Sequence, residues 1–202
     1  FYSYAHVPWI KPGQRRYTEA DLPSNEIKRE LYELGKSMFE EGGYEEIGMD
    51  HFALQSDELS LALKNKTLHR NFMGYTPQCT KLMVGLGVSS ISDSWTGFAQ
   101  NLKVVEAYKK AVEEGRFPIF RGHELSEEDL VLRQHILQIM CHYETVWQDE
   151  DLQSQQVYDA IERLREMEED ELVELKPFEL QVTDKGKPFV RNVCMAFDAR
   201  LW

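Results

Sequence analysis

The first 54 residues alternate between segments typical of strands and a segment typical of a helix, and this order restricts the possible folds. Residues 1–7 (FYSYAHV) are rich in aromatic and β-branched side chains and stop at Pro8, which predicts a strand. Ser24 is placed to cap a helix whose apolar residues recur at helical spacing, namely Ile27, Leu31, Leu34 and Met38. A second strand-like run covers residues 44–52. Strand, helix and strand in this order predict a parallel βαβ unit, with ligands gathering at the C-terminal strand ends.

Asp50 and His51 fall at the predicted end of that second strand. Such a pair can bind a metal, transfer a proton or hold the next loop together. A histidine beside an aspartate in a turn is more often a structural pair than a catalyst. We therefore expect these two residues to order the loop, and the sequence assigns no catalytic residue.

The segment between Pro8 and Pro23 reads as a long polar loop, and it holds the only dense basic patch of the chain, with Lys11, Arg15 and Arg16. The formal net charge of the whole chain is −12, which disfavours nucleic acid and anionic membranes as partners. An anionic ligand therefore needs a local basic pocket. Arg70, beside His69, is a further candidate for such a pocket.

Several other classes of site are disfavoured by spacing. The pair Gly85 and Gly87 lacks the third glycine of a dinucleotide-binding fingerprint. Three widely separated cysteines favour a reducing compartment over a disulfide framework, and no metal-ligand spacing occurs, so no metal site is predicted. No apolar run approaches the roughly 20 residues that cross a bilayer. We expect a cytoplasmic protein without membrane or nucleic-acid partners.

The second half of the chain changes to helical patterns, and we place a domain boundary between residues 1–100 and 101–202. Ser126 and Asp129 form a capping box for one helix, and residues 173–182 alternate around Lys176 and Pro177 as expected of a hairpin. Helices with a small hairpin suggest a winged-helix-like module. Because residues 144–179 are heavily acidic, this module is interpreted as a helical packing domain and not as a DNA-binding one.

Five separated blocks resemble the oxygen-independent coproporphyrinogen III oxidases, in order and with matching spacing across the chain. The blocks are YAHVP (4–8), IGMDHFA (47–53), LHRNFMGYT (68–76), GLGVSSIS (85–92) and VTDKGKPFVRNVCMAFD (182–198). The resemblance implies an α/β plus α-helical protein: the closing part of a partial (β/α) radical-SAM barrel, followed by a helical C-terminal domain.

The resemblance also implies a reaction. Members of this family use S-adenosyl-L-methionine and a [4Fe–4S] cluster to decarboxylate two propionates of coproporphyrinogen III oxidatively, which gives protoporphyrinogen IX in anaerobic haem biosynthesis. The cluster is bound by a C-x-x-x-C-x-x-C motif that this chain does not contain. We therefore expect the chain alone to be inactive and its parent to be a monomeric enzyme that needs an electron donor.

Site residues follow from the matching motifs. The resemblance implies cofactor contacts by Ala5, Phe72 and Ile91, while Met73 replaces the polar glutamine that follows the phenylalanine in the family pattern. The substrate carries four carboxylates. We expect Arg15, Arg16 or Arg70 to pair with its propionates through bidentate contacts.

Two other functions stay open on the sequence. One is a radical-SAM-like haem chaperone or tetrapyrrole-binding protein, and the other is a naturally truncated interaction protein. The sequence does not decide the order of decarboxylation, the electron acceptor, the oligomeric state, or whether the truncation is natural.

Overall fold

The computed structural model describes residues 2, 4–148 and 154–201, and the chain divides into two compact units. Unit 1 is Phe1–Lys64 and unit 2 is Asn65–Trp202. The expected boundary near residue 100 divides the chain differently and stays a prediction. None of the helices formed by the described residues combines the length and apolar composition needed to cross a bilayer.

Unit 1 is built from a helix and a hairpin. Its elements are η1 (Pro12–Arg16), η2 (Glu19–Asp21), α1 (Asn25–Glu41), β1 (Tyr44–Gly48), β2 (His51–Leu54) and α2 (Glu58–Lys64). The predicted cap of α1 is confirmed, because the Ser24 side chain accepts a hydrogen bond from the Ile27 N–H at 3.3 Å. Gly42 follows the last residue of this helix.

One face of α1 packs on β1 and β2. The Tyr32 hydroxyl donates to Glu46 Oε1 at 3.1 Å, and Lys36 Nζ donates to Glu46 Oε2 at 2.6 Å. The Phe39 ring stacks on Phe52 with centroids 4.8 Å apart. The four apolar residues predicted from the helical spacing, Ile27, Leu31, Leu34 and Met38, form a row that is about half exposed to solvent.

The strands β1 and β2 form an antiparallel hairpin, so the predicted parallel βαβ unit is wrong. Gly48 pairs with His51, which leaves Met49 and Asp50 as a two-residue loop with φ of 39° and 66°. Positive φ at both central residues is the type I′ geometry, whose twist suits an antiparallel hairpin. Through this turn, β2 pairs with β1, the strand directly before it.

The predicted strand over residues 1–7 is also wrong for the residues that the structure describes there, 2 and 4–7. Gln14 satisfies the backbone at this point instead of a neighbouring strand. Its Oε1 accepts from the Val7 N–H at 2.6 Å, and its Nε2 donates to the Ala5 carbonyl at 3.2 Å. A strand needs a partner ladder, and a side chain from the following 3-10 helix supplies these bonds instead.

Unit 2 combines small sheets with helices. Its elements are β3 (His69–Asn71), β4 (Gly74–Thr76), β5 (Ile91–Asp93), β6 (Gly97–Asn101), α3 (Val105–Glu113), β7 (Ile119–Glu124), α4 (Glu127–His142), β8 (Glu144–Val146), α5 (Gln155–Arg163), α6 (Arg165–Glu169), β9 (Val173–Lys176), β10 (Glu179–Val182), η4 (Lys187–Phe189) and α7 (Val190–Ala196). The strand orders are β3-β4, β5-β6-β7 and β8-β10-β9, and all pairings are antiparallel. No barrel is formed by the described residues.

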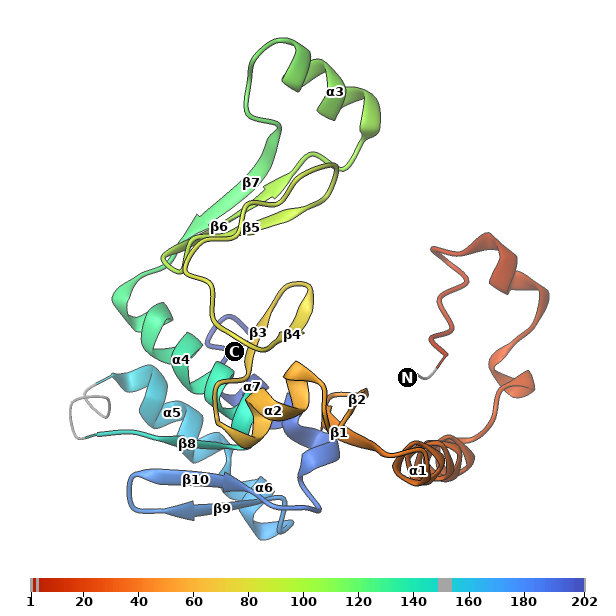
Figure 1. Cartoon of the computed structure of the whole chain (residues 1–202), viewed down its shortest axis with the longest axis vertical. Helices are drawn as coiled ribbons and strands as arrows, with labels where there is room; N and C mark the ends of the chain where they lie inside the picture. The colour runs from red at the N-terminus through yellow and green to blue at the C-terminus, as the bar shows by residue number, and fades with distance from the viewer. Residues whose placement is uncertain (1, 3, 149–153, 202) are drawn as a thin grey trace. The chain divides into compact units, whose positions relative to one another are not determined.

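Helix α4 is the centre of unit 2 and contacts α7, β8, β3 and α5 (Figure 1). The predicted capping box is confirmed, because the Ser126 hydroxyl accepts from the Asp129 N–H and the Asp129 carboxylate accepts from the Ser126 N–H. The predicted hairpin is confirmed as β9 and β10. Buried side chains include Ile139 of α4, Val157 of α5, Leu180 of β10, Val193 of α7 and Phe197, which directly follows α7.

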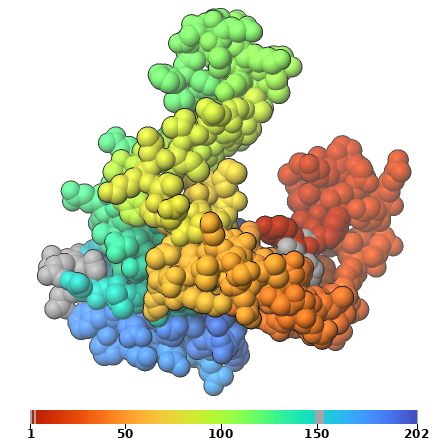
Figure 2. All heavy atoms as spheres, viewed as in Figure 1, coloured from red at the N-terminus to blue at the C-terminus, as the bar shows by residue number. Residues whose placement is uncertain are grey.

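The sheet β5-β6-β7 and helix α3 form the part of unit 2 that is coloured yellow to green in Figure 2. Apolar side chains of this part stay exposed, among them Leu86, Val112, Phe117 and Phe120. Such exposure over neighbouring residues is unusual for a free surface.

Gly186 marks a close approach of two backbone segments after β10. A Cβ at this position would lie 1.8 Å from the Leu172 carbonyl oxygen, which accepts from the Thr183 N–H at 3.1 Å.

We expect Gly186→Ala to lower the free energy of unfolding by about 1–3 kcal/mol, because the backbone must move to make room for the added methyl group. Urea unfolding would measure it. Gly13→Ala is the matched control, since nothing lies within 4 Å of its Cβ position, and equal losses in both variants would contradict the prediction.

Candidate functional site

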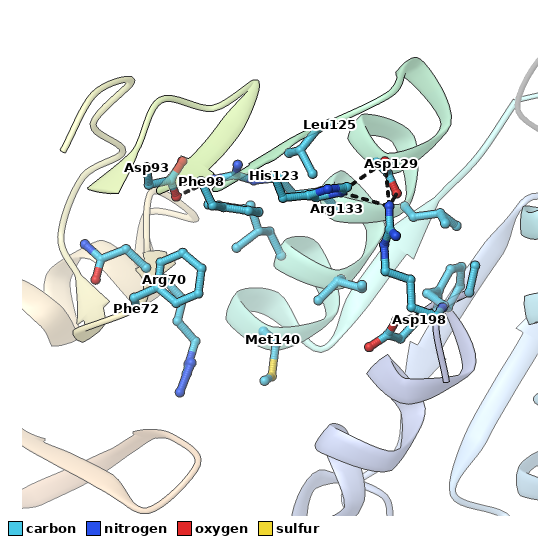
Figure 3. Close-up of a pocket in the computed structure, with 17 residues that line it drawn as sticks. Arg70, Phe72, Asp93, Phe98, His123, Leu125, Asp129, Arg133, Met140 and Asp198 are labelled. Carbon is cyan, nitrogen blue, oxygen red and sulfur yellow. Dashed lines mark hydrogen bonds and ion pairs between the residues drawn. The ribbon is translucent and has the colours of Figure 1, made fainter. Parts of the chain in front are cut away.

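A cavity of about 650 Å³, which we call the large cavity, opens in unit 2 between α4, the ends of β3, β5 and β7, and the segment after α7 (Figure 3). Its apolar lining comes from Leu125, Leu132, Ile136, Leu137, Met140 and Phe197, with Phe72 and Phe98. Its charged or ionisable lining comes from Arg70, Arg133, Arg200, His123, Asp93, Asp129 and Asp198. Apolar walls with a few placed polar groups are typical of small-molecule sites.

Arg133 of α4 ties one wall of the large cavity together. Its Nη2 donates to Asp93 Oδ2 at 2.7 Å and its Nη1 donates to the Trp95 carbonyl at 2.8 Å. The guanidinium carbon lies 4.4 Å from the Trp95 ring centroid and 4.9 Å from that of Phe98. The ion pair is largely buried, with 13% and 11% of the two side chains exposed. Arg133 therefore fixes the β5–β6 turn against α4.

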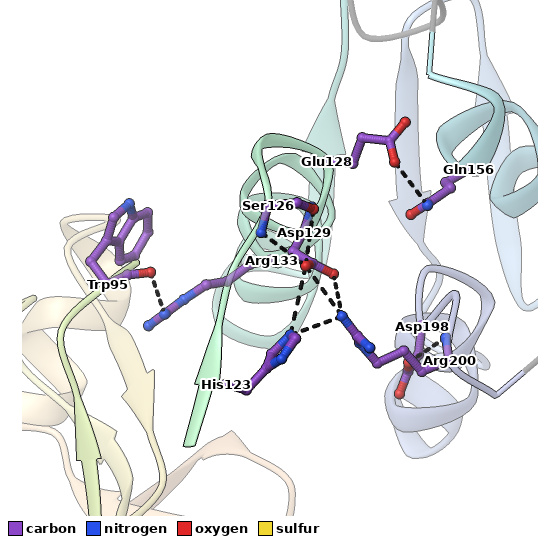
Figure 4. A network of polar contacts seen from close by, with 9 residues as sticks. All are labelled: Trp95, His123, Ser126, Glu128, Asp129, Arg133, Gln156, Asp198 and Arg200. Atoms are coloured by element: carbon purple, nitrogen blue, oxygen red, sulfur yellow. Dashed lines mark hydrogen bonds and ion pairs between the residues drawn. The ribbon is translucent and has the colours of Figure 1, made fainter. Parts of the chain in front are cut away.

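Asp129, at the start of α4, carries the second polar network (Figure 4). Arg200 Nη2 lies 3.3 Å from each Asp129 oxygen and donates to His123 Nε2 at 2.8 Å. Hydrogen bonds from Ser126, above all from its backbone N–H, and the charge of Arg200 lower the pKa of the Asp129 carboxyl. This network holds the segment after α7 against α4 and β7.

Arg70 lies on β3 at the edge of the large cavity. Its guanidinium carbon stands 5.2 Å from the Tyr75 ring centroid, and its buried Nε has no hydrogen-bond partner among the described residues. The Tyr75 hydroxyl donates to the Met140 carbonyl at 3.0 Å. Burial is the main reason that the pKa of Tyr75 is raised, so the neighbour of Arg70 is a neutral phenol.

A second cavity of about 370 Å³, the small cavity, is lined by Phe72, Phe98 and Ile91. Phe72 and Ile91 were both predicted from the sequence as cofactor contacts, and the structure places both on this lining. The predicted residues Phe72, Ile91 and Arg70 are thus gathered in unit 2, although they come from different elements. Met73, beside them in sequence, is exposed.

The remaining predicted residues belong to unit 1. Ala5 is exposed and its carbonyl accepts from Gln14. Arg15 and Arg16 end η1 and are exposed, with Arg15 Nε donating to the Pro8 carbonyl at 2.9 Å. Their role in a site stays a prediction.

Asp50 and His51 lie at the tip of the β1–β2 hairpin. Asp50 adopts a positive φ, which aspartate tolerates better than most residues, and His51 Nδ1 is 2.8 Å from the Met49 carbonyl. His51 Nε2 also lies 3.4 Å from the Tyr2 hydroxyl, so the contacts of His51 are not confined to the turn. The loop-ordering role stays a prediction.

The described residues do not fit an iron–sulfur cluster. They contain no group of three or more His, Cys, Asp or Glu side chains that could hold a metal ion. Burial raises the pKa of the Cys141 and Cys194 thiols to about 12, whereas a metal ligand must be a thiolate. Cys79 is exposed.

His69, on β3, makes the folding stability of the chain depend on pH. Burial is the main cause that lowers its pKa, and the charge of Arg133 adds to it. Burial also lowers the pKa of His142. The unfolded imidazoles, with a pKa of about 6.5, then bind protons more readily than the folded ones, so stability falls as the pH drops through and below that value. Urea midpoints at pH 7.5 and 5.5 should differ less in the His69→Gln, His142→Gln double variant, and an unchanged difference would contradict this.

Comparison with known proteins places this geometry in a family. No family model matches the chain. The oxygen-independent coproporphyrinogen III oxidase of Salmonella typhimurium is 35% identical over 205 residues, which covers 99% of this chain and 45% of that protein. The anaerobic coproporphyrinogen III oxidase 1 of Cereibacter sphaeroides is 43% identical over 142 residues, covering 70% of this chain and 31% of that protein. A solved structure of the Escherichia coli coproporphyrinogen III oxidase, described as a radical SAM enzyme, superposes with a TM-score of 0.89 at 35% identity and covers 98% of this chain.

The chain is homologous to a portion of the oxygen-independent coproporphyrinogen III oxidases. It spans a little under half the length of the relatives that match over almost all of it. The resemblance predicted from the five sequence blocks is therefore confirmed. The mixed α/β character is confirmed as well, with small antiparallel sheets.

Sequence reasoning missed several residues of this coproporphyrinogen III oxidase homologue. Asp93 and Arg133 are 40 positions apart, and Asp129 and Arg200 are 71 apart. No local spacing links such pairs. Phe98 was missed for another reason, because an aromatic residue in a strand is expected to pack in a core.

Proposed function

We propose that this chain is the C-terminal portion of an oxygen-independent coproporphyrinogen III oxidase, a cytoplasmic radical SAM enzyme that converts coproporphyrinogen III to protoporphyrinogen IX in anaerobic haem biosynthesis. The observation that carries the proposal is the match to these enzymes over 99% of the chain. In the complete protein, residues 1–100 form the closing part of the partial barrel and residues 101–202 the helical domain. The chain alone is inactive, because the cluster ligands belong to the other portion.

The large cavity supports this assignment as the substrate site. Its apolar walls suit a tetrapyrrole, and the substrate's propionates require cations that can form paired hydrogen bonds. Arg70 is the best placed of the predicted cations, since its Nε is buried without a partner among the described residues. Arg133 is fully engaged by Asp93 and Trp95 and serves the wall instead. Arg15 and Arg16 are proposed as propionate partners in the complete enzyme.

The small cavity supports a cofactor site. Its lining by Phe72 and Ile91 offers apolar surface on which an adenosyl group can pack. Phe72 and Ile91 would hold the adenosyl group of S-adenosyl-L-methionine, which would supply radical chemistry in the complete enzyme. In this proposal the residues of the chain bind and orient the cofactor, and Ala5 is proposed as a cofactor contact in the complete enzyme. Asp50 and His51 order their hairpin.

An anaerobic assay tests the proposal. The complete protein, carrying its cluster, is incubated with coproporphyrinogen III, S-adenosyl-L-methionine and a reductant, and the product is oxidised to protoporphyrin and quantified by fluorescence. We expect two propionates of each substrate molecule to be converted to vinyl groups, with release of two molecules of CO2. Retention of haem without turnover would replace the proposal with the haem-chaperone function, and a reading frame without the cysteine motif would favour a truncated interaction protein.

Arg70 provides a residue-level test. We expect Arg70→Ala in the complete protein to weaken coproporphyrin III binding about tenfold or more, the order expected when hydrogen bonds to a charged group are lost. Fluorescence titration measures this, with Arg191→Ala as the matched control because Arg191 is exposed on α7. Equal affinity of the Arg70→Ala variant and the unaltered protein would remove Arg70 from the substrate site.

A further inference from the structure

The large and small cavities share one wall. Phe72, Phe98 and His123 line both of them. The side chains of these three residues are therefore common to the two cavities. A ligand that packs on one side of these rings touches the same side chains as a ligand on the other side.

The wall is a packed pair of rings. Phe72 follows β3 and Phe98 lies on β6, and their rings meet edge to face with centroids 5.0 Å apart and an interplanar angle of 88°. Edge-to-face packing is a preferred arrangement of aromatic rings, so each ring restricts the other. Because 53% of Phe72 stays exposed, a ligand can reach this ring, and a change in its position alters the contact that Phe98 makes with it.

Arg133 packs against the Phe98 ring of this wall. Its guanidinium carbon is 4.9 Å from the Phe98 ring centroid, while Asp93 and the Trp95 carbonyl hold its two Nη atoms. Cation–π contact at this distance is favourable and strengthens when the pair is shielded from water. Phe98 is thus held between Phe72 on one side and a fixed cation on the other (Figure 3).

From this arrangement we infer that Phe98, positioned by Arg133, couples the two cavities, so that an adenosyl ligand in the small cavity changes the affinity of the large cavity for a carboxylate-bearing tetrapyrrole. The inference rests on the proposed function and adds to it a specific positioning role for two residues that the sequence did not single out. Coupling between two binding sites is reciprocal, so either ligand reports it. Arg133 acts through Phe98 in this role, although its side chain also lines the large cavity.

Two stable probes measure the coupling in the complete protein. Coproporphyrin III is fluorescent, and S-adenosylhomocysteine is an unreactive adenosyl ligand. The dissociation constant of coproporphyrin III is measured without and with saturating S-adenosylhomocysteine, and the ratio of the two constants is the coupling factor. We expect a factor of about 5 or more for the unaltered protein, the lower end of typical allosteric coupling.

Variants of the residues that form the shared wall then test whether this wall carries the coupling. Phe98→Leu removes the ring and should bring the factor to about 1, whereas Phe98→Tyr keeps the ring and should preserve it. Arg133→Lys retains a cation for Asp93 but loses the planar group that stacks on the ring, and it should reduce the factor. Met140→Leu is the control, because Met140 lines only the large cavity of the two, and its factor should equal that of the unaltered protein even where its affinity changes.

The outcomes separate the two proposals. Failure of the unaltered protein to bind either probe would overturn the proposed function and this inference with it. Binding of both probes without coupling, or coupling that survives in Phe98→Leu, would overturn the inference alone. Loss of coupling in Met140→Leu to the same extent as in Phe98→Leu would also overturn it, since the effect would then not belong to the shared wall.

Discussion

Replacing Arg133 with alanine is expected to lower the free energy of unfolding by about 3–5 kcal/mol, because it leaves the carboxylate of Asp93 buried without its counter-charge. Only 11% of the Asp93 side chain is exposed, so water cannot take the place of the guanidinium. The substitution also removes the donor to the Trp95 carbonyl and the stacking on two rings. Urea unfolding at neutral pH, followed by circular dichroism, measures the loss.

A surface ion pair is the control for this effect. Arg165 pairs with Glu162 at 2.9 Å, but 59% and 42% of these side chains are exposed, and such a pair adds little to stability because water and salt screen it. Arg165→Ala should therefore unfold close to the unaltered chain. The double variant Arg133→Ala, Asp93→Ala should be less destabilised than the sum of the two single variants, because it no longer buries a lone charge. Additive losses would show that burial of the charge is not the cause.

Replacing Phe197 with alanine is expected to cost about 3–5 kcal/mol, the range for removing a large aromatic side chain from a core. Phe197 is 1% exposed, directly follows α7, and its ring lies 5.5 Å from that of His135 on α4. Its loss would open a void beneath the large cavity and loosen the segment that carries Arg200. Thermal and urea unfolding both report the change.

Phe117 offers a matched control for Phe197, since the same substitution is made at a side chain that is 89% exposed. Phe117→Ala should change the stability by no more than about 0.5 kcal/mol, as is usual for surface positions. A loss of under 1 kcal/mol in Phe197→Ala would mean that the surrounding helices collapse into the void.

The elements that the sequence predicts correctly are those whose signals are local. The Ser24 cap, the Ser126–Asp129 capping box and the hairpin over residues 173–182 all depend on side chains within a few positions of each other. Each signal has a mechanism that acts before any tertiary contact forms. These predictions are confirmed for that reason.

The wrong predictions concern pairing between distant segments. A parallel βαβ unit needs the first strand to find a partner beyond a helix, whereas Met49 and Asp50 form a two-residue turn that pairs β1 with its immediate neighbour. Residues 1–7 carry a strand-like composition, but composition does not supply a ladder partner. The backbone there is bonded by Gln14 instead.

The candidate site was predictable only where a family motif carried it. Phe72 and Ile91 came from the resemblance, Arg70 came from the search for a basic pocket, and all three line cavities of unit 2. The wall that supports them, Phe98 with Arg133 and Asp93, has no motif, because its members meet only through the packing of α4 on the β5–β6 turn. Contacts between residues so far apart in the sequence can be identified only from the folded structure.

The apolar row along α1 bears on how this chain behaves in solution. Ile27, Leu31, Leu34 and Met38 lie about half exposed on a molecule whose net charge of −12 keeps copies apart. Added salt screens that repulsion over shorter distances but does not weaken the hydrophobic attraction between apolar side chains. Concentrated samples of the 202-residue chain should therefore be handled at low ionic strength, where mutual repulsion preserves a dispersed state.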